Sequence, residues 1–227
     1  MNRRAIPAAA ALLIVTCASG WAAEPTYVAT YLDVKSASVN AGAGLTRQHV
    51  RATRAEAGNL RINAFQEIGR SNRFVVIETW TDPAAFAKHE KAAHTIEFRR
   101  KLKIIHRSPY DQRVTHGFAV DPTPAVPGPN ALYVVTHVDV PGAQRHDAER
   151  VLKQLFQSSH AGPGQVRFDI YQQDDPRANH FMMFVVWSSR RAFEDYADTP
   201  QWLQFREALA PLLGAPYDER LYRLLGP

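Results

Sequence analysis

An internal repeat is the property of this 227-residue sequence that restricts its possible folds most strongly. Segments of the first half return in the second half at an offset of 106 residues, and then at 107 after a one-residue insertion. The aligned pairs are 27–34 with 133–140, 58–66 with 164–172, Trp80 with Trp187, Phe98 with Phe205, and Leu102 with Leu209. A register kept over about 90 residues with one insertion indicates a tandem duplication of one structural unit.

Each copy carries the same order of strand and helix patterns. Alternating, β-branched and aromatic runs predict strands in the first copy at 27–34, 60–67, 73–80 and 111–118. Residues 45–57 predict a helix that ends at Gly58, and Asp82-Pro83 begins a second helical region. Thr199-Pro200 restarts the matching region of the second copy, so we expect this region to consist of two helices. The order β-α-β-β-α-β predicts an α+β fold of two ferredoxin-like units.

A proline-rich segment separates the two copies. Residues 119–131 contain four prolines, which fix φ and favour an extended, stiff linker. We therefore predict one domain at 26–118 and a second at 132–227. Because one unit of about 90 residues leaves a sheet face uncovered, we expect the two sheets to pack on each other as an intrachain pseudo-dimer. The sequence leaves open whether this pseudo-dimer associates further.

The N-terminus has the layout of a secretory signal peptide. Basic residues at 1–4 precede an apolar core, and small residues follow before Glu24-Pro25, so we predict a signal at 1–23 and a periplasmic or secreted protein. Removing it would lower the formal net charge from +5 to +3 and take away Cys17, the only cysteine. Thr16 stands where a lipid-attachment box has a small residue, so we expect no lipid anchor. No later apolar run is long enough for a stable membrane span.

Several short motifs of the first copy occur in a recognisable order. They are Gly58-x-Leu-Arg-x-x-x-Phe-Gln66, Arg73-Phe-Val-Val-Ile-Glu-Thr-Trp80, Asp82-x-x-Ala-Phe-x-x-His89 and His94-x-x-x-Phe98. In this order and spacing they resemble the antibiotic biosynthesis monooxygenase domain, over nearly all of the first copy and more loosely over the second. The resemblance implies a dimeric α+β barrel. It also implies oxidation of quinols or polyphenolic aromatics with O₂, without metal, flavin or other cofactor.

Haem degradation is a second activity found among proteins of this topology. Haem-degrading relatives use an Asn on the first strand and a Trp and a His in the second helical region. The corresponding positions here hold Thr30, Lys88 and Arg99, which argues against haem as the substrate.

Three histidines are candidates for the base or hydrogen-bond acceptor that such an oxidation requires. His94 matches a histidine of the family and lies at the expected helix break, so it is the first catalytic candidate. His89, one helical turn after Phe86, is the second, although a buried packing role fits it as well. His49 on the first helix is a candidate for substrate binding.

Two further residues are candidates for lining the binding pocket. Trp80 recurs as Trp187, which favours a packing role first and a pocket role second. Thr30 recurs as Thr136 in the strand phase expected to face the helices, where its hydroxyl could orient a ligand. Arg61 and Arg167 also recur, and we expect them to form surface or inter-copy ion pairs.

The sequence argues against a metal site and against nucleic acid as a partner. His89 and His94 are five residues apart, which on a continuous helix places them about 140° apart, so we predict no metal ligands. The basic run 99–103 lies on a helix whose buried stripe holds Phe98 and Leu102, which is typical of a solvated face. No nucleic-acid-binding module is recognisable.

Three functions therefore remain open. The first is an exported, cofactor-independent monooxygenase acting on a small quinol-like or polyphenolic molecule with O₂. The second is a non-catalytic periplasmic small-molecule-binding or stress-related protein, and the third is a barrel without a ligand. The first copy is the expected active half, because His89, His94 and Glu78 become Tyr196, Gln201 and Val185 in the second.

Overall fold

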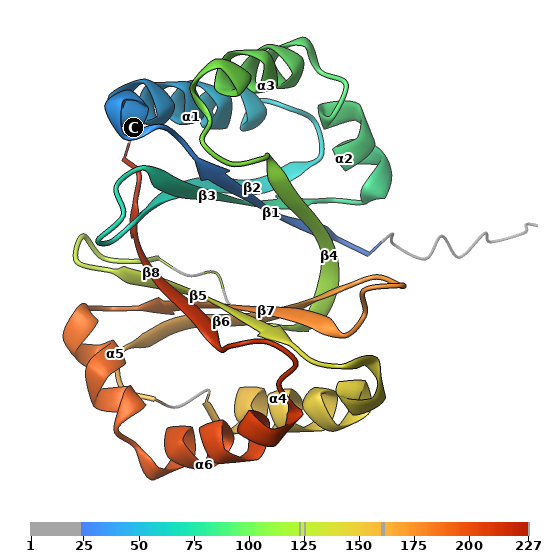
Figure 1. Ribbon diagram of the computed structural model, residues 1–227, viewed down its shortest axis with the longest axis vertical. Coiled ribbons are helices and arrows are strands. Elements are labelled where there is room, and N and C mark those ends of the chain that lie inside the picture. Colours follow the sequence, from blue (N-terminus) through green and yellow to red (C-terminus); the bar gives the residue numbers. More distant parts are fainter. Residues whose placement is uncertain (1–23, 123, 125, 160–161, 227) are drawn as a thin grey trace, which may run out of the picture.

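The two copies fold into one closed barrel with helices on both outer sides (Figure 1). The computed structural model describes residues 24–226 except 123, 125, 160 and 161. The first copy consists of β1 (Thr26–Asp33), α1 (Val39–Thr53), β2 (Asn59–Glu67), β3 (Arg73–Trp80), α2 (Pro83–His89), α3 (Ala93–Ile105) and β4 (Asp111–Val120). The second consists of β5 (Leu132–Asp139), α4 (Arg145–Ser159), β6 (Gln165–Gln173), β7 (His180–Trp187), α5 (Arg190–Ala197), α6 (Pro200–Leu209) and β8 (Asp218–Leu224). The expected signal at 1–23 lies outside the described residues.

The last strand of each copy joins the two sheets. Strand order around the barrel is β1-β3-β2-β8-β5-β7-β6-β4, and all pairings between these strands are antiparallel. β4 pairs with β1 of its own copy and with β6 of the other, while β8 pairs with β5 and with β2. The predicted α+β pseudo-dimer is confirmed, and the exchanged strands leave neither sheet with a free edge.

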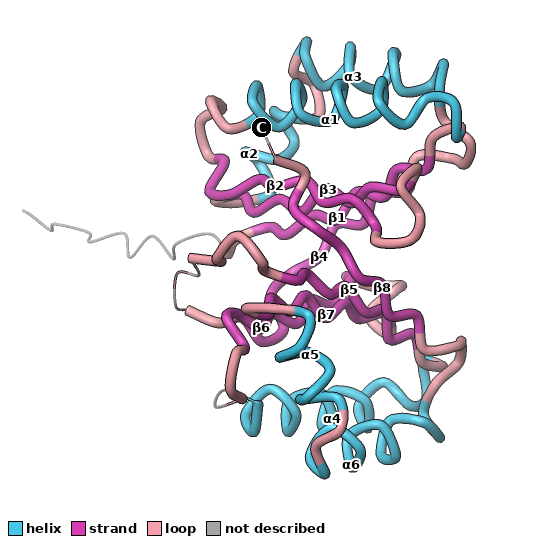
Figure 2. The backbone as a smooth tube through the Cα atoms, turned by 90° about the vertical axis from the view of Figure 1, so that its left-hand side faces the viewer, coloured by secondary structure: helices cyan, strands magenta, loops and turns pink. Residues whose placement is uncertain are grey.

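Apolar side chains fill three layers. Between the sheets lies a core of alternating strand residues, among them Ala29, Tyr31, Phe65, Tyr171 and Phe184. The opposite strand faces pack against the helices, α1–α3 over one sheet and α4–α6 over the other (Figure 2). The candidate residues of the first copy therefore lie between its sheet and the helices α1–α3. Among the described residues, no helix has the length and apolar character to cross a bilayer.

The helix α1 begins earlier than its sequence predicts. Helical spacing indicated a start at residue 45, whereas α1 begins at Val39 and continues through Gly42 and Gly44. A Cβ at Gly42 would lie 3.1 Å from a methyl carbon of Val34, so glycine lets the helix approach β1 closely. Packing against the sheet stabilises the helix and offsets the low helix propensity of its glycines. The predicted break in the second helical region is confirmed in both copies.

A buried carboxylate connects the two copies. Asp169 on β6 is 0% exposed and accepts hydrogen bonds from Arg167 Nε at 2.5 Å and from the Tyr171 hydroxyl at 2.7 Å. Arg61 on β2 lies 3.5 Å from the same carboxylate and donates to the Tyr171 hydroxyl at 3.3 Å. The inter-copy ion pair expected for Arg61 is therefore present. The corresponding Arg167 pairs within its own copy.

Candidate active site

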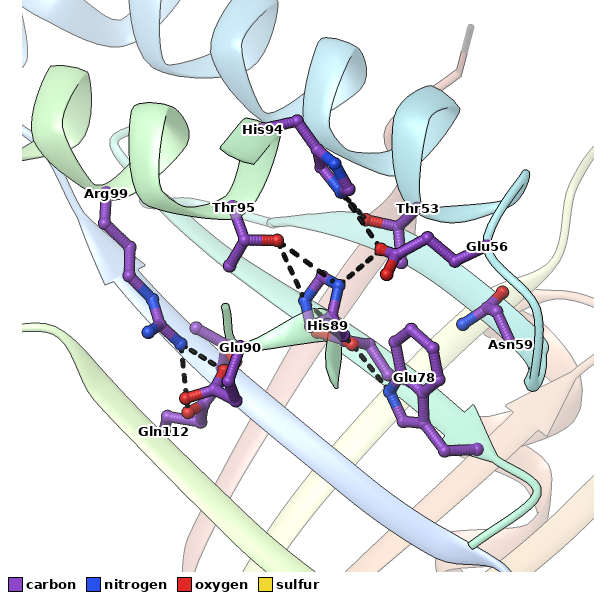
Figure 3. Close-up of polar contacts among 12 residues, drawn as sticks. Thr53, Glu56, Asn59, Glu78, His89, Glu90, His94, Thr95, Arg99 and Gln112 are labelled. Carbon is purple, nitrogen blue, oxygen red and sulfur yellow. Dashed lines mark hydrogen bonds and ion pairs between the residues drawn. The ribbon is translucent and has the colours of Figure 1, made fainter. Parts of the chain in front are cut away.

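Three of the predicted site residues come together between the helices and the sheet of the first copy. His49 on α1, His89 at the end of α2 and His94 at the start of α3 have ring centroids 5.4 to 5.8 Å apart. Trp80 at the end of β3 lies 4.8 Å from the His89 ring. Figure 3 shows His89 between the strands and the two helices, with His94 pointing from α3 toward Thr53 and Glu56.

The predicted separation of His89 and His94 is wrong. A continuous helix would hold them apart, but α2 ends at His89 and α3 begins at Ala93, with the chain turning at residues 90–92. Pro83 and the Asp82 cap begin α2, whereas Ala92, with its extended backbone, begins α3 in a new direction. The break therefore brings the two rings onto the same side, 5.8 Å apart.

His89 is held between two carboxylates. Its side chain is 1% exposed, its Nδ1 lies 2.6 Å from Glu56 Oε1, and its Nε2 lies 3.7 Å from Glu78 Oε2. The Thr95 hydroxyl lies 3.3 Å from Nδ1. Burial lowers the pKa of His89, while the hydrogen bond to Glu56 acts in the opposite direction.

Glu78 is a buried acid fixed by an indole. The residue is 1% exposed, and its Oε2 accepts a hydrogen bond from Trp80 Nε1 at 2.9 Å. Burial raises the pKa of Glu78 to about 7, and the Trp80 hydrogen bond offsets part of this effect. Trp80 is itself 0% exposed and borders none of the cavities described below. Its role is to pack the core and to orient Glu78.

His94 and His49 border a small cavity between α1 and α3. The cavity has a volume of about 80 Å³ and is also lined by Leu45 and Phe98. His94 is 30% exposed, and its Nε2 lies 3.0 Å from Glu56 Oε1. His49 stacks on Phe98 at 4.2 Å, and its Nδ1 is buried without a hydrogen-bond partner. Burial lowers the pKa of His49 to about 3, so this imidazole is neutral.

A larger cavity lies between α3 and β4. Its volume is about 450 Å³, and its lining includes Glu90, Arg99, Tyr110 and Gln112. Arg99 pairs with Glu90, its Nη2 lies 3.4 Å from Gln112 Oε1, and its guanidinium lies 5.0 Å from the centre of the Tyr110 ring. Gln112 Nε2 donates to the Tyr110 hydroxyl at 3.2 Å.

Thr30 belongs to this second group of residues. Its hydroxyl accepts a hydrogen bond from Gln112 at 3.3 Å, and the residue is 2% exposed, behind the cavity lining. The structure thus places Thr30 by the larger cavity and His49 and His94 by the smaller one. His89 is buried between them and lines neither.

The second copy has no equivalent of the histidine cluster in the part of the chain that the structure describes. Leu155, Tyr196, Gln201 and Gly162 stand at the positions of His49, His89, His94 and Glu56. One cavity of the second copy, of about 20 Å³, is lined largely by apolar side chains such as Val185 and Trp187. Another, of about 300 Å³, is lined by Leu155, Ser158 and Gln201 and matches the small cavity of the first copy. The first copy is therefore distinguished by its histidines and carboxylates, whereas polar side chains line a cavity between the helices of both copies.

Sequence reasoning did not select several polar residues of this region. They are Glu56, Glu78, Arg99 and Gln112. The replacement of Glu78 by Val185 indicated the active half but did not lead to a site role for Glu78. Gly162 replaces Glu56 in the same way, and this difference between repeats is a signal that could have identified both. Arg99 and Gln112 carry no such signal, because Arg206 and Glu219 are also polar.

Comparison with known proteins supports the resemblance. The profile of the family described as "Antibiotic biosynthesis monooxygenase" matches residues 25–101 and 131–208. "Putative monooxygenase YcnE" of Bacillus subtilis (strain 168) is 39% identical over 62 residues, which are 27% of this chain and 65% of that protein. "Uncharacterized protein sll1783" of Synechocystis is 24% identical over 93 residues, which are 41% of this chain and 63% of that protein. The alignments thus span slightly less than two thirds of either relative.

Solved structures match the whole barrel. A putative monooxygenase from Fusobacterium nucleatum superposes with a TM-score of 0.79 at 15% identity, covering 90% of this chain and 94% of that one. One from Lactobacillus acidophilus NCFM gives 0.71 at 15% identity, covering 89% and 95%. A protein described as anthrone oxidase-like gives 0.70 at 12% identity, covering 90% and 94%. At these identities the likeness concerns the fold. The two profile matches, one in each copy, show that the chain belongs to the antibiotic biosynthesis monooxygenase family as a tandem duplication.

Proposed function

We propose that this protein is an exported monooxygenase that oxidises a quinol-like or polyphenolic small molecule with O₂, and that it does so in its first copy. The observation that carries the proposal is the cavity of about 450 Å³ between α3 and β4, with Arg99, Tyr110 and Gln112 on its lining. Its size suits a small aromatic molecule, and the polar and charged side chains beside Leu102 and Pro109 on its wall can fix that molecule's orientation.

The positive charge of Arg99 supplies the electrostatic element of the reaction. A phenol transfers an electron to O₂ more readily as its anion, and a guanidinium next to the hydroxyl stabilises that anion. Gln112 and the Tyr110 hydroxyl offer further hydrogen-bonding groups on the same wall. Glu90 lies on the same wall and pairs with Arg99, so a phenolate would bind by replacing this carboxylate as the partner of the guanidinium.

The second copy is less suited to an anion. Glu219 stands at the position of Gln112 and accepts a hydrogen bond from the Tyr217 hydroxyl at 3.4 Å. Burial raises the pKa of Glu219, but an acidic side chain remains where the first copy has an amide. A phenolate bound there would lie next to a group that repels it whenever that group is ionised.

The reaction can be balanced without an external reductant. A ring C–H of the quinol becomes C–OH and the ring is left as the quinone, so that one atom of O₂ enters the product and the other leaves as water. The substrate supplies all four electrons. The role of base expected for His94 remains a hypothesis, since His94 lines the smaller cavity.

A substrate panel tests the proposed activity. We expect O₂-dependent turnover of at least one member of a set of hydroquinones, polyphenols and anthrone, no turnover under argon, and one ¹⁸O atom per product from ¹⁸O₂. Heat-denatured protein is the control for autoxidation. Equal rates with native and denatured protein across the panel would contradict the proposal. In the same assay, unchanged turnover by His94→Ala would exclude the catalytic role of His94.

Export is tested separately. With the full sequence expressed in a Gram-negative host, we expect periplasmic protein that begins near residue 24. Cytoplasmic protein that keeps residues 1–23 would contradict export and leave the oxidation untouched.

A further inference from the structure

The cluster around His89 lies outside the cavity of about 450 Å³ to which the oxidation is assigned. Glu56 Oε1 lies 2.6 Å from His89 Nδ1 and 3.0 Å from His94 Nε2. The three ligand atoms all lie within 4.8 Å of one another. Two imidazole nitrogens and one carboxylate oxygen converge here from three different elements.

We propose that Glu56, His89 and His94 bind one divalent transition-metal ion of the Zn²⁺ type. Two histidines and one glutamate are a common protein ligand set for Zn²⁺, with a fourth position left to water. Zn–N and Zn–O bonds of about 2.0–2.2 Å place tetrahedral ligand atoms about 3.4 Å apart. Glu56 Oε1 lies 2.6 Å from His89 Nδ1 and 3.0 Å from His94 Nε2, both hydrogen-bond distances that are shorter than this spacing, so the Glu56 carboxylate has to move outward to admit an ion.

The position of Glu56 allows its carboxylate to move away from the two histidines. It lies in the turn between α1 and β2, not inside a helix or strand, and its side chain is 19% exposed. His94 is 30% exposed. An ion can thus approach from solvent along the Glu56 and His94 side, and a small movement of the Glu56 carboxylate makes room for it.

His89 has a carboxylate near each of its ring nitrogens, as metal-binding histidines often have near the nitrogen that does not bind the ion. A histidine that binds metal through one nitrogen normally donates its other N–H to a carboxylate or carbonyl. Here Nδ1 faces Glu56, and Nε2 faces the Glu78 carboxylate at 3.7 Å. Trp80 fixes Glu78 by its indole hydrogen bond at 2.9 Å. Glu78 lies beyond hydrogen-bond distance of Nε2, and we assign it as a positioning residue on the expectation that the Nε2 N–H turns toward it when Nδ1 binds the ion.

The second copy provides an internal comparison. Gly162, Tyr196 and Gln201 occupy the positions of Glu56, His89 and His94, so none of the three ligands is repeated. The Tyr196 hydroxyl instead pairs with Ser159 at 2.7 Å. The inference therefore predicts one ion per chain, bound in the first copy.

Binding can be measured on the full chain without any substrate. We expect isothermal titration with Zn²⁺ to give one site per chain, and bound Co²⁺ to show the intensified visible absorption of a four- or five-coordinate ion. Glu56→Gln and His94→Gln are partly exposed positions, and each should weaken Zn²⁺ binding at least tenfold. Glu78→Gln should weaken it about tenfold through the orientation of His89.

A matched control is His116→Gln, which removes a surface histidine whose Nδ1 lies 2.8 Å from Asp174. This variant should bind Zn²⁺ as the unsubstituted chain does, and circular dichroism should show that all variants are folded. Absence of Zn²⁺ binding, or binding that Glu56→Gln and His94→Gln leave unchanged, would overturn the inference. Because no turnover is measured, these results are independent of the proposed oxidation.

Discussion

Replacement of Asp169 by alanine is expected to lower the free energy of unfolding by about 3–5 kcal/mol, because it removes the carboxylate from a buried ion pair. Arg167 Nε and the Tyr171 hydroxyl both donate to Asp169 Oδ2, and the backbone N–H of Asp121 donates to Oδ1 at 3.1 Å. Without the carboxylate, the buried Tyr171 hydroxyl loses its acceptor and the Arg61 guanidinium loses an anion of the other copy. The loss therefore affects the packing of the two sheets directly.

Urea denaturation followed by circular dichroism measures this change. The matched control is Asp174→Ala, which removes an exposed carboxylate whose partner is His116. Such surface pairs contribute about 0–1 kcal/mol, so this variant should stay close to the unsubstituted protein. Equal midpoints for the Asp169 and Asp174 variants would show that Asp169 is not central to the contact between the copies.

Acidification is expected to destabilise the barrel through His137 on β5. The residue is 6% exposed, and its Nε2 is buried without a hydrogen-bond partner. Burial lowers the pKa of His137 to about 4, and Arg113 and Arg220 add to this effect, while Asp218 and Asp139 oppose it. The folded protein therefore keeps this imidazole neutral at pH values where a free histidine is already protonated.

The pH window follows from these two pKa values. Between the unfolded value of about 6.5 and the folded value of about 4, the unfolded chain binds the proton and the folded chain does not. The stability due to neutral His137 is complete above about pH 6.5 and falls as the pH decreases to 4, where the loss levels off. At about 1.4 kcal/mol per pKa unit, the loss between pH 7 and 4.5 is about 2 kcal/mol.

The His137→Gln variant isolates this contribution. Its amide oxygen can still accept the hydrogen bond that Arg113 Nη1 makes to His137 Nδ1 at 3.0 Å, but it does not titrate. Urea denaturation at pH 7 and at pH 4.5 should show a loss of stability smaller by about 2 kcal/mol in the variant. Other groups, including His49, titrate in both proteins and cancel in the comparison. The same pH dependence in both proteins would contradict the assigned cause.

The sequence was sufficient to predict the fold because the repeat supplied every element twice. The alternation at 27–34, Gly58 with its counterpart Gly164, and the broken helical region were each visible in both copies. Gly58 and Gly164 have φ of +87° and +84°, and a Cβ there would lie 2.6 and 2.5 Å from Cβ atoms of Ala85 and Ala192. Such positions require glycine, so the duplication preserved them.

The exchange of β4 and β8 between the sheets was not visible in the sequence. A strand pattern specifies which face is buried, but it does not specify the neighbour with which the strand pairs. The start of α1 was missed for a similar reason, because the contact of Gly42 with Val34 exists only in the folded protein.

The site was predicted in part. Histidines stand out in a sequence, so His49, His89 and His94 were selected and do converge. Their carboxylate partners were not selected, because Glu56 lies in a turn and Glu78 lies in an apolar strand where its burial cannot be known beforehand. Trp80 was selected for its recurrence, but the structure gives it a supporting position behind Glu78.

The central claim is that oxidation takes place in the first copy, at the cavity bordered by Arg99. The most direct test compares O₂ uptake by Arg99→Gln and Arg206→Gln, two equivalent positions whose guanidinium groups both lie over a tyrosine ring. Loss of a group that stabilises developing negative charge typically lowers turnover by about 10²-fold or more. We predict that loss for Arg99→Gln and turnover within about twofold of the unsubstituted protein for Arg206→Gln. Equal losses in both variants, or a loss confined to Arg206→Gln, would contradict the account.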